Sequence, residues 1–210
     1  MNVAFMGYRD WALKIFKALE PMRAILTPTD ISQADVVLYY GWSEMIQKEL
    51  YENKICLILH PSPLPKYRGG SPLQHQIING EKESAVTILR ASDKLDAGAI
   101  YSQTPFSLEG TLDEIFERIV DIAIDDTQKV LEQIERDMFY EDPKGTLQDE
   151  TKATLFKRRK PEESELKIED FKNKTSDELH NFIRALNDPY PNAFIRCKDG
   201  KKLYLTGSHL

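Results

Sequence analysis

Hydrophobic residues in this chain occur either in short continuous runs or in stripes with helical spacing. Continuous runs are typical of strands that are buried on both faces, whereas a period near 3.6 residues is typical of amphipathic helices. These patterns predict strands at residues 2–6, 35–40, 55–59, 84–91 and 98–106, and helices at residues 11–19, 72–79, 111–138 and 176–186. Because strands and helices alternate along most of the chain, we predict an α/β fold.

Polar residues mark where several of these elements begin. Asp10 and Thr111 are expected to cap the helices that follow them. A further helix should begin after Ile46 and run to about Tyr51. The helix that usually joins the second and third strands of such folds is expected to be missing or very short. A short strand and a loop are expected at residues 22–34, a turn at residues 142–145, and a hairpin around residues 198–201.

The stretch from residue 55 to residue 72 carries the first candidate site. Its apolar strand is expected to stop at His60–Pro61, because proline has no N–H with which to continue a ladder. Ser71–Pro72 reads as the N-cap and first residue of a helix. A histidine then lies at the carboxyl end of a central strand, where open α/β sheets bind ligands, and Arg68 lies beside a helix start that suits an anion.

A second motif follows at residues 93–100. The strand over residues 85–89 runs into this acidic turn, which places Asp96 on a loop, where its carboxylate could orient His60 or relay protons with it. The alternatives stay open at this point. A lone histidine is often structural, a proline-rich turn is often only a turn, and Arg68 could be a solvated charge.

The order and spacing of these motifs resembles the folate-dependent N-formyltransferases. The sequence from His60 to Gly69 has the pattern His-Pro-Ser-x-Leu-Pro-x-x-Arg-Gly, and Asp-x-Gly-x-Ile follows at Asp96. The resemblance is dense from about residue 40 to 103 and resumes at residues 156–162 and 179–191, where it is most like the sugar-nucleotide and methionyl-tRNA branches. It implies a Rossmann-like formyltransferase core with a mostly parallel sheet at residues 1–140 and a short α/β extension at residues 141–210, packed on that core.

The resemblance also implies the reaction and its central residues. The co-substrate would be 10-formyltetrahydrofolate, with no metal. His60 would stabilise the developing oxyanion or take the proton of the attacking amine, and Asp96 would orient His60. The family places an asparagine two residues before the histidine, and this chain has Ile58 there. Alternate residues of a strand share a face, so Ile58 should lie beside His60 and offer no hydrogen bond. A pseudoenzyme that binds its ligands without transferring formyl is therefore an alternative.

Two further groups of residues are candidates for ligand contacts. The expected folate-binding residues are Tyr40, Gly41, Trp42, Met45, Ile46 and Asp93. The expected acceptor-binding residues are Arg9, Ser62, Lys66, Arg68, Gly69 and Tyr190. An aromatic residue, a flexible glycine and apolar side chains after a strand suit a flat heterocycle. The alternatives are that Trp42 belongs to the core, that Arg9 is a surface charge, that Tyr190 packs rather than stacks on a base, and that the cations at 158–160 are solvated.

Composition narrows the expected acceptor. The 210 residues carry a net charge of −6, and the pI is near 5.4, which argues weakly against a nucleic-acid partner. We therefore expect small-molecule substrates, and the resemblance of residues 156–162 and 179–191 to the sugar-nucleotide branch implies a nucleotide-linked amino sugar as the acceptor. The specific expectation is a 4-amino-4,6-dideoxy sugar nucleotide of the kind used for surface nonulosonic acids such as pseudaminic acid. Glycinamide ribonucleotide and methionyl-tRNA are the alternative acceptors.

The remaining sequence features bound the location and chemistry of the chain. Cys56 and Cys197 form no recognisable disulfide or metal pattern. The sequence has no signal peptide and no apolar run of membrane-spanning length, so we expect a cytoplasmic protein without a membrane partner. A homodimer is one arrangement that the sequence allows.

Overall fold

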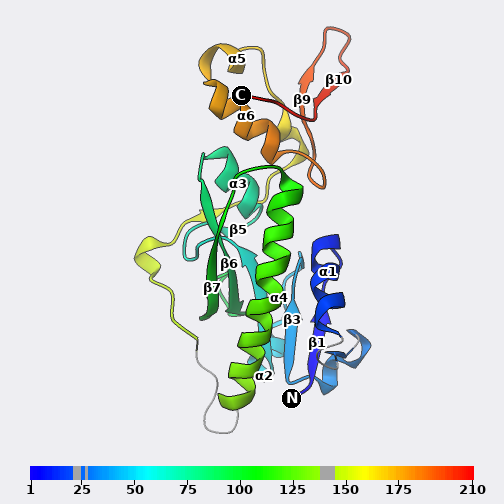
Figure 1. Cartoon of the computed structure of the whole chain (residues 1–210), viewed down its shortest axis with the longest axis vertical. Helices are drawn as coiled ribbons and strands as arrows, with labels where there is room; N and C mark the ends of the chain where they lie inside the picture. Colours follow the sequence, from blue (N-terminus) through cyan, green and yellow to red (C-terminus); the bar gives the residue numbers. More distant parts are fainter. Residues whose placement is uncertain (21–24, 27, 138–144) are drawn as a thin grey trace.

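The structure is a computed structural model that describes residues 1–20, 25–26, 28–137 and 145–210. Met138, at the predicted end of the long helix, and most of the turn predicted at 142–145 lie outside these residues. The chain forms a layered α/β core with a smaller group of elements from its carboxyl-terminal part at one end (Figure 1).

A six-stranded sheet with the order β2-β1-β3-β4-β6-β7 forms the centre of the core. Its strands are β1 (Val3–Met6), β2 (Ile25–Leu26), β3 (Val36–Tyr39), β4 (Ile55–Pro61), β6 (Glu83–Arg90) and β7 (Ile100–Ser107). The first four pair in parallel, and β6 runs antiparallel to both β4 and β7. The predicted Rossmann-like fold with a mostly parallel sheet is confirmed, with β6 as the reversed strand.

Helices cover both faces of this sheet. On one face, α1 (Asp10–Leu19), α3 (Pro72–Ile78) and the long α4 (Leu112–Asp137) enclose the main hydrophobic core (Figure 1). On the other face, the 3-10 helix η1 (Pro28–Gln33) and α2 (Lys48–Asn53) lie beside a smaller cluster that includes Tyr39, Cys56 and the half-buried Ile58. Because neighbouring residues of a strand point to opposite faces, β4 contributes Leu57 to the first cluster and Cys56 to the second.

The carboxyl-terminal elements are η2 (Glu150–Lys152), β8 (Leu155–Phe156), η3 (Pro161–Ser164), α5 (Asp170–Asn173), α6 (Ser176–Ala185), β9 (Ala193–Arg196) and β10 (Lys202–Leu205). Of these, α6 lies next to α3 and the start of α4 (Figure 1). Arg184 of α6 donates to the carbonyl oxygens of Leu108 and Gly110. β9 and β10 form the predicted hairpin. The division of the chain at residue 140 stays a prediction.

The predicted boundaries of the core elements hold to within two residues, and three local details differ from the prediction. Strand β4 continues through Pro61, which pairs with Val86. Because β3 ends opposite Ile58, no β3 residue pairs with residue 61, and the missing proline N–H breaks no bond on that side. Arg9 is the N-cap of α1, and Asp10 lies in its first turn, where its charge suits the helix dipole. The second short helix begins at Lys48 and extends to Asn53.

Other predicted starts are confirmed. Glu114 donates its N–H to the Thr111 hydroxyl, and the Glu114 carboxylate accepts from the Thr111 N–H, which is a reciprocal cap for α4. The helix between the second and third strands is short, as predicted, and consists of the 3-10 helix η1. Among the described residues, no helix has both the length and the apolar character that crossing a bilayer requires.

Candidate active site

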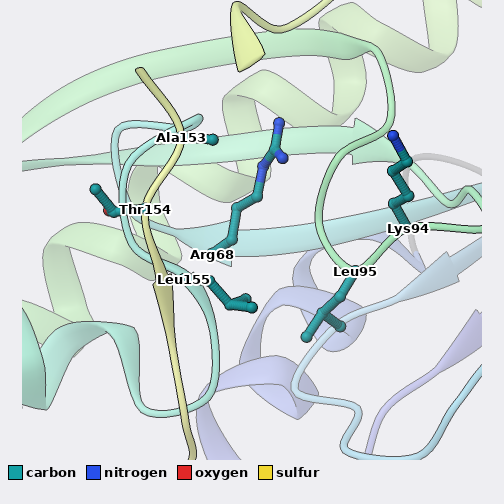
Figure 2. Close-up of a pocket in the computed structure, with 6 residues that line it drawn as sticks. All are labelled: Arg68, Lys94, Leu95, Ala153, Thr154 and Leu155. Atoms are coloured by element: carbon teal, nitrogen blue, oxygen red, sulfur yellow. The ribbon is translucent and has the colours of Figure 1, made fainter. Parts of the chain in front are cut away.

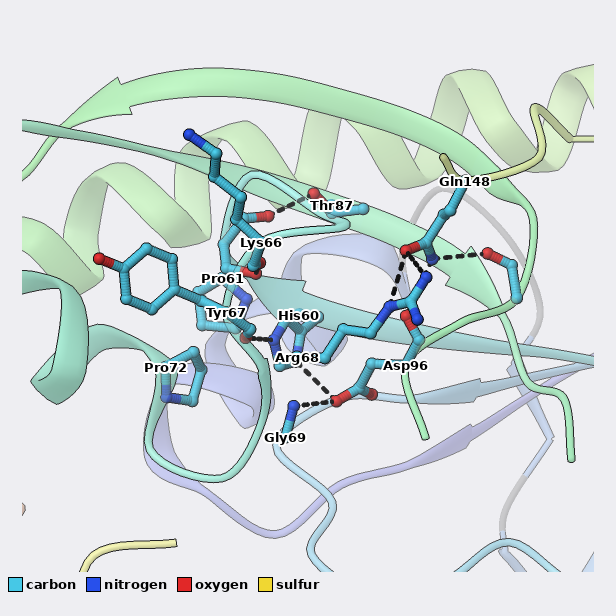
Figure 3. Close-up of polar contacts among 12 residues, drawn as sticks. His60, Pro61, Lys66, Tyr67, Arg68, Gly69, Pro72, Thr87, Asp96 and Gln148 are labelled. Carbon is cyan, nitrogen blue, oxygen red and sulfur yellow. Dashed lines mark hydrogen bonds and ion pairs between the residues drawn. The ribbon is translucent and has the colours of Figure 1, made fainter. Parts of the chain in front are cut away.

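His60 is fixed near the end of β4 by a single well-defined contact. Its Nε2 lies 2.8 Å from the carbonyl oxygen of Tyr67, and only 6% of the residue is exposed (Figure 3). A carbonyl oxygen only accepts, so Nε2 carries the proton and donates. The contact therefore fixes both the orientation of the ring and the nitrogen that holds the proton in its neutral form.

Asp96 faces the other ring nitrogen of His60. Its Oδ2 lies 3.6 Å from Nδ1 and accepts a hydrogen bond of 2.8 Å from the Gly69 N–H. Because β6 runs antiparallel to β4, the chain leaves β6 beside the start of β4, where the Ala91 N–H donates to the Cys56 carbonyl oxygen. The loop of residues 91–99 must therefore return along the sheet to bring Asp96 to His60. Asp96 takes a left-handed backbone conformation (φ +51°) in this loop. The structure thus brings together the two residues that the sequence singled out.

The loop between β4 and α3 is held by its own polar groups. The Ser62 hydroxyl donates to the carbonyl oxygen of Lys66, and Thr87 donates to the carbonyl oxygen of Ser62. Ser62 is fully buried, whereas Lys66 is exposed. The hydroxyl predicted to contact substrate is therefore part of the loop's internal structure, and Lys66 is the residue of this pair that faces solvent.

A segment from the far side of the core crosses over this loop. We call residues 146–156 the crossing segment. Its β8 pairs with β5 (Arg68–Gly69), and Thr154 accepts from the backbone N–H groups of both Tyr67 and Arg68. Gly69 has φ +95°, and a Cβ there would lie 2.2 Å from the Phe156 carbonyl oxygen, so only glycine fits. The crossing segment thereby fixes the backbone that holds both His60 and Asp96.

Arg68 is engaged inside the protein. Its guanidinium donates to Gln148 Oε1 at 2.8 and 3.1 Å and to Glu150 at 2.6 and 3.1 Å. The hydrogen bonds from Arg68 hold the pKa of the Glu150 carboxyl below its usual value. The predicted phosphate contact at Arg68 would have to compete with these partners.

The predicted capping role of Ser71 is wrong. Ser71 does precede α3, but its φ is +55° and its hydroxyl accepts from the Arg159 N–H instead of capping the helix. Arg159 belongs to the basic cluster at residues 158–160, so the backbone of this cluster is anchored to the core, and Arg159 also places its guanidinium over the Phe182 ring. At the start of α3, the Ser71 hydroxyl is therefore bound to the carboxyl-terminal extension, and the helix start is not a ready anion site.

A model of the formyl transferase family matches residues 17–133, which is more than half of the chain and includes both His60 and Asp96. The chain belongs to the formyl transferase family. The family indicated by the His60 and Asp96 motifs is thus confirmed.

Two curated relatives of the chain are methionyl-tRNA formyltransferases. The chain is 34% identical over 172 residues to a methionyl-tRNA formyltransferase from Lysinibacillus sphaericus and 33% identical over 170 residues to one from Protochlamydia amoebophila. These matches cover 80% and 79% of this chain but 52% and 51% of the relatives. The chain therefore spans about half the length of the curated relatives it matches.

Solved structures with this fold include both predicted branches. A methionyl-tRNA formyltransferase from Clostridium thermocellum is 27% identical, with a TM-score of 0.77 and coverage of 97% of this chain and 96% of that one. A likely sugar N-formyltransferase from Mycobacterium tuberculosis has the same TM-score of 0.77 at 21% identity, with coverage of 97% and 95%. HypX from Aquifex aeolicus, in complex with tetrahydrofolic acid, has a TM-score of 0.81 at 21% identity, covering 98% of this chain and 37% of HypX.

The loop predicted to bind folate begins with the positive-φ residue Gly41 (φ +63°). The Trp42 ring lies edge-on to the rings of Tyr39 and Tyr8, with centroids 5.8 Å apart in each case. Trp42 and Ile46 are half-buried against the second cluster, whereas Met45 is 79% exposed. Asp93 is also exposed, in the loop that carries Asp96.

Tyr40 is a correction to the predicted folate site. Its side chain is fully buried in the main core, where its hydroxyl hydrogen-bonds to Thr127 of α4 at 2.9 Å. Burial raises its pKa, so the hydroxyl stays protonated. Because neighbouring strand residues point to opposite faces, Tyr39 is the tyrosine on the side of Trp42 and Ile58.

The contacts of Arg9 and Tyr190 are with residues outside the His60 loop. Arg9 donates to the Ser43 hydroxyl at 3.1 Å, and its positive charge acts on Tyr190. The Tyr190 ring packs on Phe116 of α4, with centroids 6.1 Å apart, and burial raises its pKa to about 12. Of the two readings left open for Tyr190, packing is the one that these contacts support.

Ile58 lies in apolar surroundings beside His60. It pairs with Tyr39 on one side and Leu89 on the other, and it packs against the second cluster. The nearby amide of Gln103 is occupied, because its Nε2 donates to the Leu64 carbonyl oxygen and to Thr87, both at 3.0 Å. At position 58, where the family has asparagine, these neighbours therefore supply no replacement hydrogen-bond donor.

A cavity of about 200 Å³ opens beside the paired loops (Figure 2). It is lined by Arg68, Lys94, Leu95, Ala153, Thr154 and Leu155. Figure 2 shows the crossing segment on one side, Lys94 and Leu95 on the other, and Arg68 between them. In the part of the chain that the structure describes, no group of three or more His, Cys, Asp or Glu side chains is arranged to hold a metal ion.

Three residues that shape the site had no signal in the sequence. Tyr67 contributes through its carbonyl oxygen, and any residue type has one. Thr154 and Gln148 lie in a stretch without periodicity. Thr154 is 87 residues from its partner Tyr67, and Gln148 is 80 residues from its partner Arg68. Tyr39, which lies beside Trp42, is a fourth residue that was missed, and the alternation of faces along β3 could have identified it.

Proposed function

We propose that this chain transfers a formyl group from 10-formyltetrahydrofolate to the primary amine of an acceptor, with His60 and Asp96 at the reacting centre. The observation that carries this proposal is the pairing of His60 Nδ1 with Asp96 in a chain of the formyl transferase family. The folate supplies an activated formyl carbon when it is bound.

The contacts of the His60 ring support Nδ1 as the nitrogen that takes part in the reaction. Nε2 is committed to the Tyr67 carbonyl oxygen, so Nδ1 is the atom that can meet the reacting groups. Its separation of 3.6 Å from Asp96 exceeds the length of a good hydrogen bond, which leaves an Nδ1–H able to donate to a third oxygen. In the doubly protonated ring, that N–H stabilises the oxygen that gains negative charge as the amine attacks the formyl carbon.

Asp96 has two tasks in this proposal. Its carboxylate offsets the positive charge of the His60 ring and accepts, through water, the proton that the attacking amine loses. As the bond between the formyl carbon and the tetrahydrofolate nitrogen breaks, that proton is returned through water to the leaving nitrogen. The hydrogen bond that Asp96 accepts from the Gly69 N–H keeps the carboxylate directed at the ring. The burial of both side chains, each with 8% exposure, strengthens the interaction between their charges.

The residues after β3 suit a folate donor. Trp42, Ile46 and Ile58 present aromatic and apolar surface on the face of the sheet that carries His60, which fits a flat heterocycle. HypX, which has the same fold, binds tetrahydrofolic acid. These observations support the predicted folate co-substrate and the predicted binding loop, with Tyr39 in place of the Tyr40 side chain.

A nucleotide-linked amino sugar is the acceptor that we propose. The net charge of −6 disfavours a large polyanion such as tRNA, and a likely sugar N-formyltransferase shares the fold. Methionyl-tRNA is the second candidate, favoured by the sequence relatives at 33–34% identity.

The test is turnover with a panel of acceptors. The purified chain is incubated with 10-formyltetrahydrofolate and, in separate reactions, 4-amino-4,6-dideoxy sugar nucleotides, glycinamide ribonucleotide or methionyl-tRNA. Release of tetrahydrofolate and a product 28 Da heavier, which is the mass of CO gained on formylation, are the readouts. Transfer to an amino-sugar nucleotide supports the proposal, and transfer to methionyl-tRNA alone replaces its acceptor. Binding of donor and acceptor without transfer or donor hydrolysis would make the chain a pseudoenzyme.

A further inference from the structure

Gln148 in the crossing segment uses all of its hydrogen-bonding groups within the site. Its Nε2 donates to the carbonyl oxygens of Asp96 and Gly98, at 2.9 and 2.8 Å, and its Oε1 accepts from Arg68 (Figure 3). A carboxamide has two N–H donors and one oxygen acceptor, so the side chain is fully satisfied. It joins the loop after β6 to the loop after β4.

Each partner of Gln148 is adjacent to a group that holds the catalytic pair. Arg68 lies between Tyr67, whose carbonyl oxygen accepts from His60, and Gly69, whose N–H donates to the Asp96 carboxylate. On the other side, the two carbonyl groups that accept from Gln148 flank Ala97, in the turn where Asp96 takes its left-handed conformation. A shift of Gln148 would therefore displace both His60 and Asp96.

We propose that Gln148 is a positioning residue that sets the separation of His60 Nδ1 and Asp96 Oδ2. This inference rests on the proposed function, because the separation matters for catalysis only if this pair does the chemistry. Gln148 itself does not touch the reacting atoms. It acts through the backbone of the two loops, by holding them in one arrangement.

Two substitutions separate the donor side of Gln148 from its acceptor side. Gln148→Leu removes both. Gln148→Glu keeps oxygen acceptors for Arg68 but has no N–H for the carbonyl oxygens of Asp96 and Gly98. Because misplacement by about 1 Å can cost roughly 100-fold in rate, both variants are expected to lose about 10- to 100-fold in kcat, with KM for donor and acceptor within about twofold of the parent.

A matched control makes the same chemical change elsewhere. Gln33 is an exposed residue at the end of η1, ahead of β3, and Gln33→Leu should leave kcat and both KM values unchanged. Circular dichroism and thermal unfolding of all variants establish that they are folded. A Gln148→Glu variant with the parent's kcat would overturn the proposal, since donation to the two carbonyl groups would then be dispensable.

An NMR readout tests the positioning without turnover. The ¹⁵N signals of the His60 ring, assigned by comparison with His60→Gln, are followed against pH in the parent, in both Gln148 variants and in Gln33→Leu. The signals should change in the Gln148 variants alone. Unchanged His60 signals in both Gln148 variants would refute the positioning role. If the His60 signals change in the Gln148 variants but the parent protein transfers no formyl group, the proposed function is refuted instead.

Discussion

Nδ1 of His60 lies 3.6 Å from Oδ2 of Asp96, while the opposite ring nitrogen donates to a backbone carbonyl oxygen. The ring is therefore oriented by the backbone of its own loop rather than by the carboxylate alone. Asp96 is free of the task of fixing the ring's tautomer, and its charge is available to the reaction. The predictions below test this division of roles.

Replacement of His60 should abolish transfer. His60→Gln keeps an amide N–H with about the reach of Nε2, which can donate to the Tyr67 carbonyl oxygen, so the loop should remain folded while the titratable nitrogen is lost. Formyl transfer is expected to fall to background with an unchanged melting temperature. His180→Ala is the control, because His180 contacts Ser208 in the carboxyl-terminal elements. Near-parental turnover in folded His60→Gln would remove His60 from the mechanism.

Asp96→Asn should reduce the rate without preventing binding. Asparagine tolerates the left-handed conformation at φ +51°, and its oxygen can still accept from the Gly69 N–H, so the main change is the loss of charge. We expect kcat to fall about 100-fold and donor affinity to stay the same. Kinetics and equilibrium titration with the donor separate the two. Loss of donor binding would make Asp96 a ligand or structural residue instead of a proton relay.

Ile58→Asn restores the family residue beside His60. The side-chain amide could donate to the developing oxyanion, a contribution typically of about 100- to 1000-fold in rate for one donor. We expect kcat to rise at least about tenfold. The free energy of unfolding should fall by about 1–3 kcal/mol, since the amide enters apolar surroundings. Ile58→Val controls for altered packing. No gain, in a chain that already turns over well, would mean that another group holds the oxyanion.

The Arg68–Glu150 pair should stabilise the protein in a pH-dependent manner. Arg68 holds the pKa of the Glu150 carboxyl below its ordinary value. A group with a lowered folded-state pKa contributes stability above its unfolded-state pKa and loses it as the pH falls through the folded-state pKa. Glu150→Gln should therefore lower the melting temperature near neutral pH, and the difference from the parent should vanish in acid. A pH-independent difference would contradict the ion pair.

Arg68→Ala distinguishes the internal role from the predicted phosphate contact. Because Arg68 is bound to Gln148 and Glu150, its loss should disturb the site as a whole and change KM for donor and acceptor to the same degree. Steady-state kinetics with each substrate varied in turn give the two values. A rise confined to the acceptor KM would show instead that Arg68 leaves these partners to bind an anion.

The two cysteines should differ sharply in reactivity. Burial raises the pKa of the Cys56 thiol to about 11, whereas Cys197 is exposed. At pH 8 the thiolate fraction of Cys56 is then about one in a thousand, and the thiolate is the reactive form. Iodoacetamide should label one cysteine per native chain, and Cys197→Ser should leave the native protein unlabelled until it is denatured.

The sequence by itself determined the elements of the core and the identity of the central pair. Continuous apolar runs locate β1, β3 and β4, and a helical stripe locates α4, because these patterns reflect burial that is local to each element. The spacing from His60 to Gly69 and the later Asp96 motif identified the family, which the family match at residues 17–133 confirms. These features depend on residue types within one element or one loop.

Only the tertiary structure decided how the candidate residues are used. In the fold, the Tyr40 side chain points into the core, and β6 runs antiparallel to β4, so that the loop of Asp96 returns along the sheet. Arg68 donates to Gln148, which is 80 residues away in the sequence. The crossing segment shows no periodicity, because its contacts go to backbone groups, to one buried guanidinium and, at Phe156, to the rings of Tyr67 and His75, rather than to a continuous apolar face. Such contacts depend on where distant backbone atoms lie in space, which the order of residue types does not encode locally.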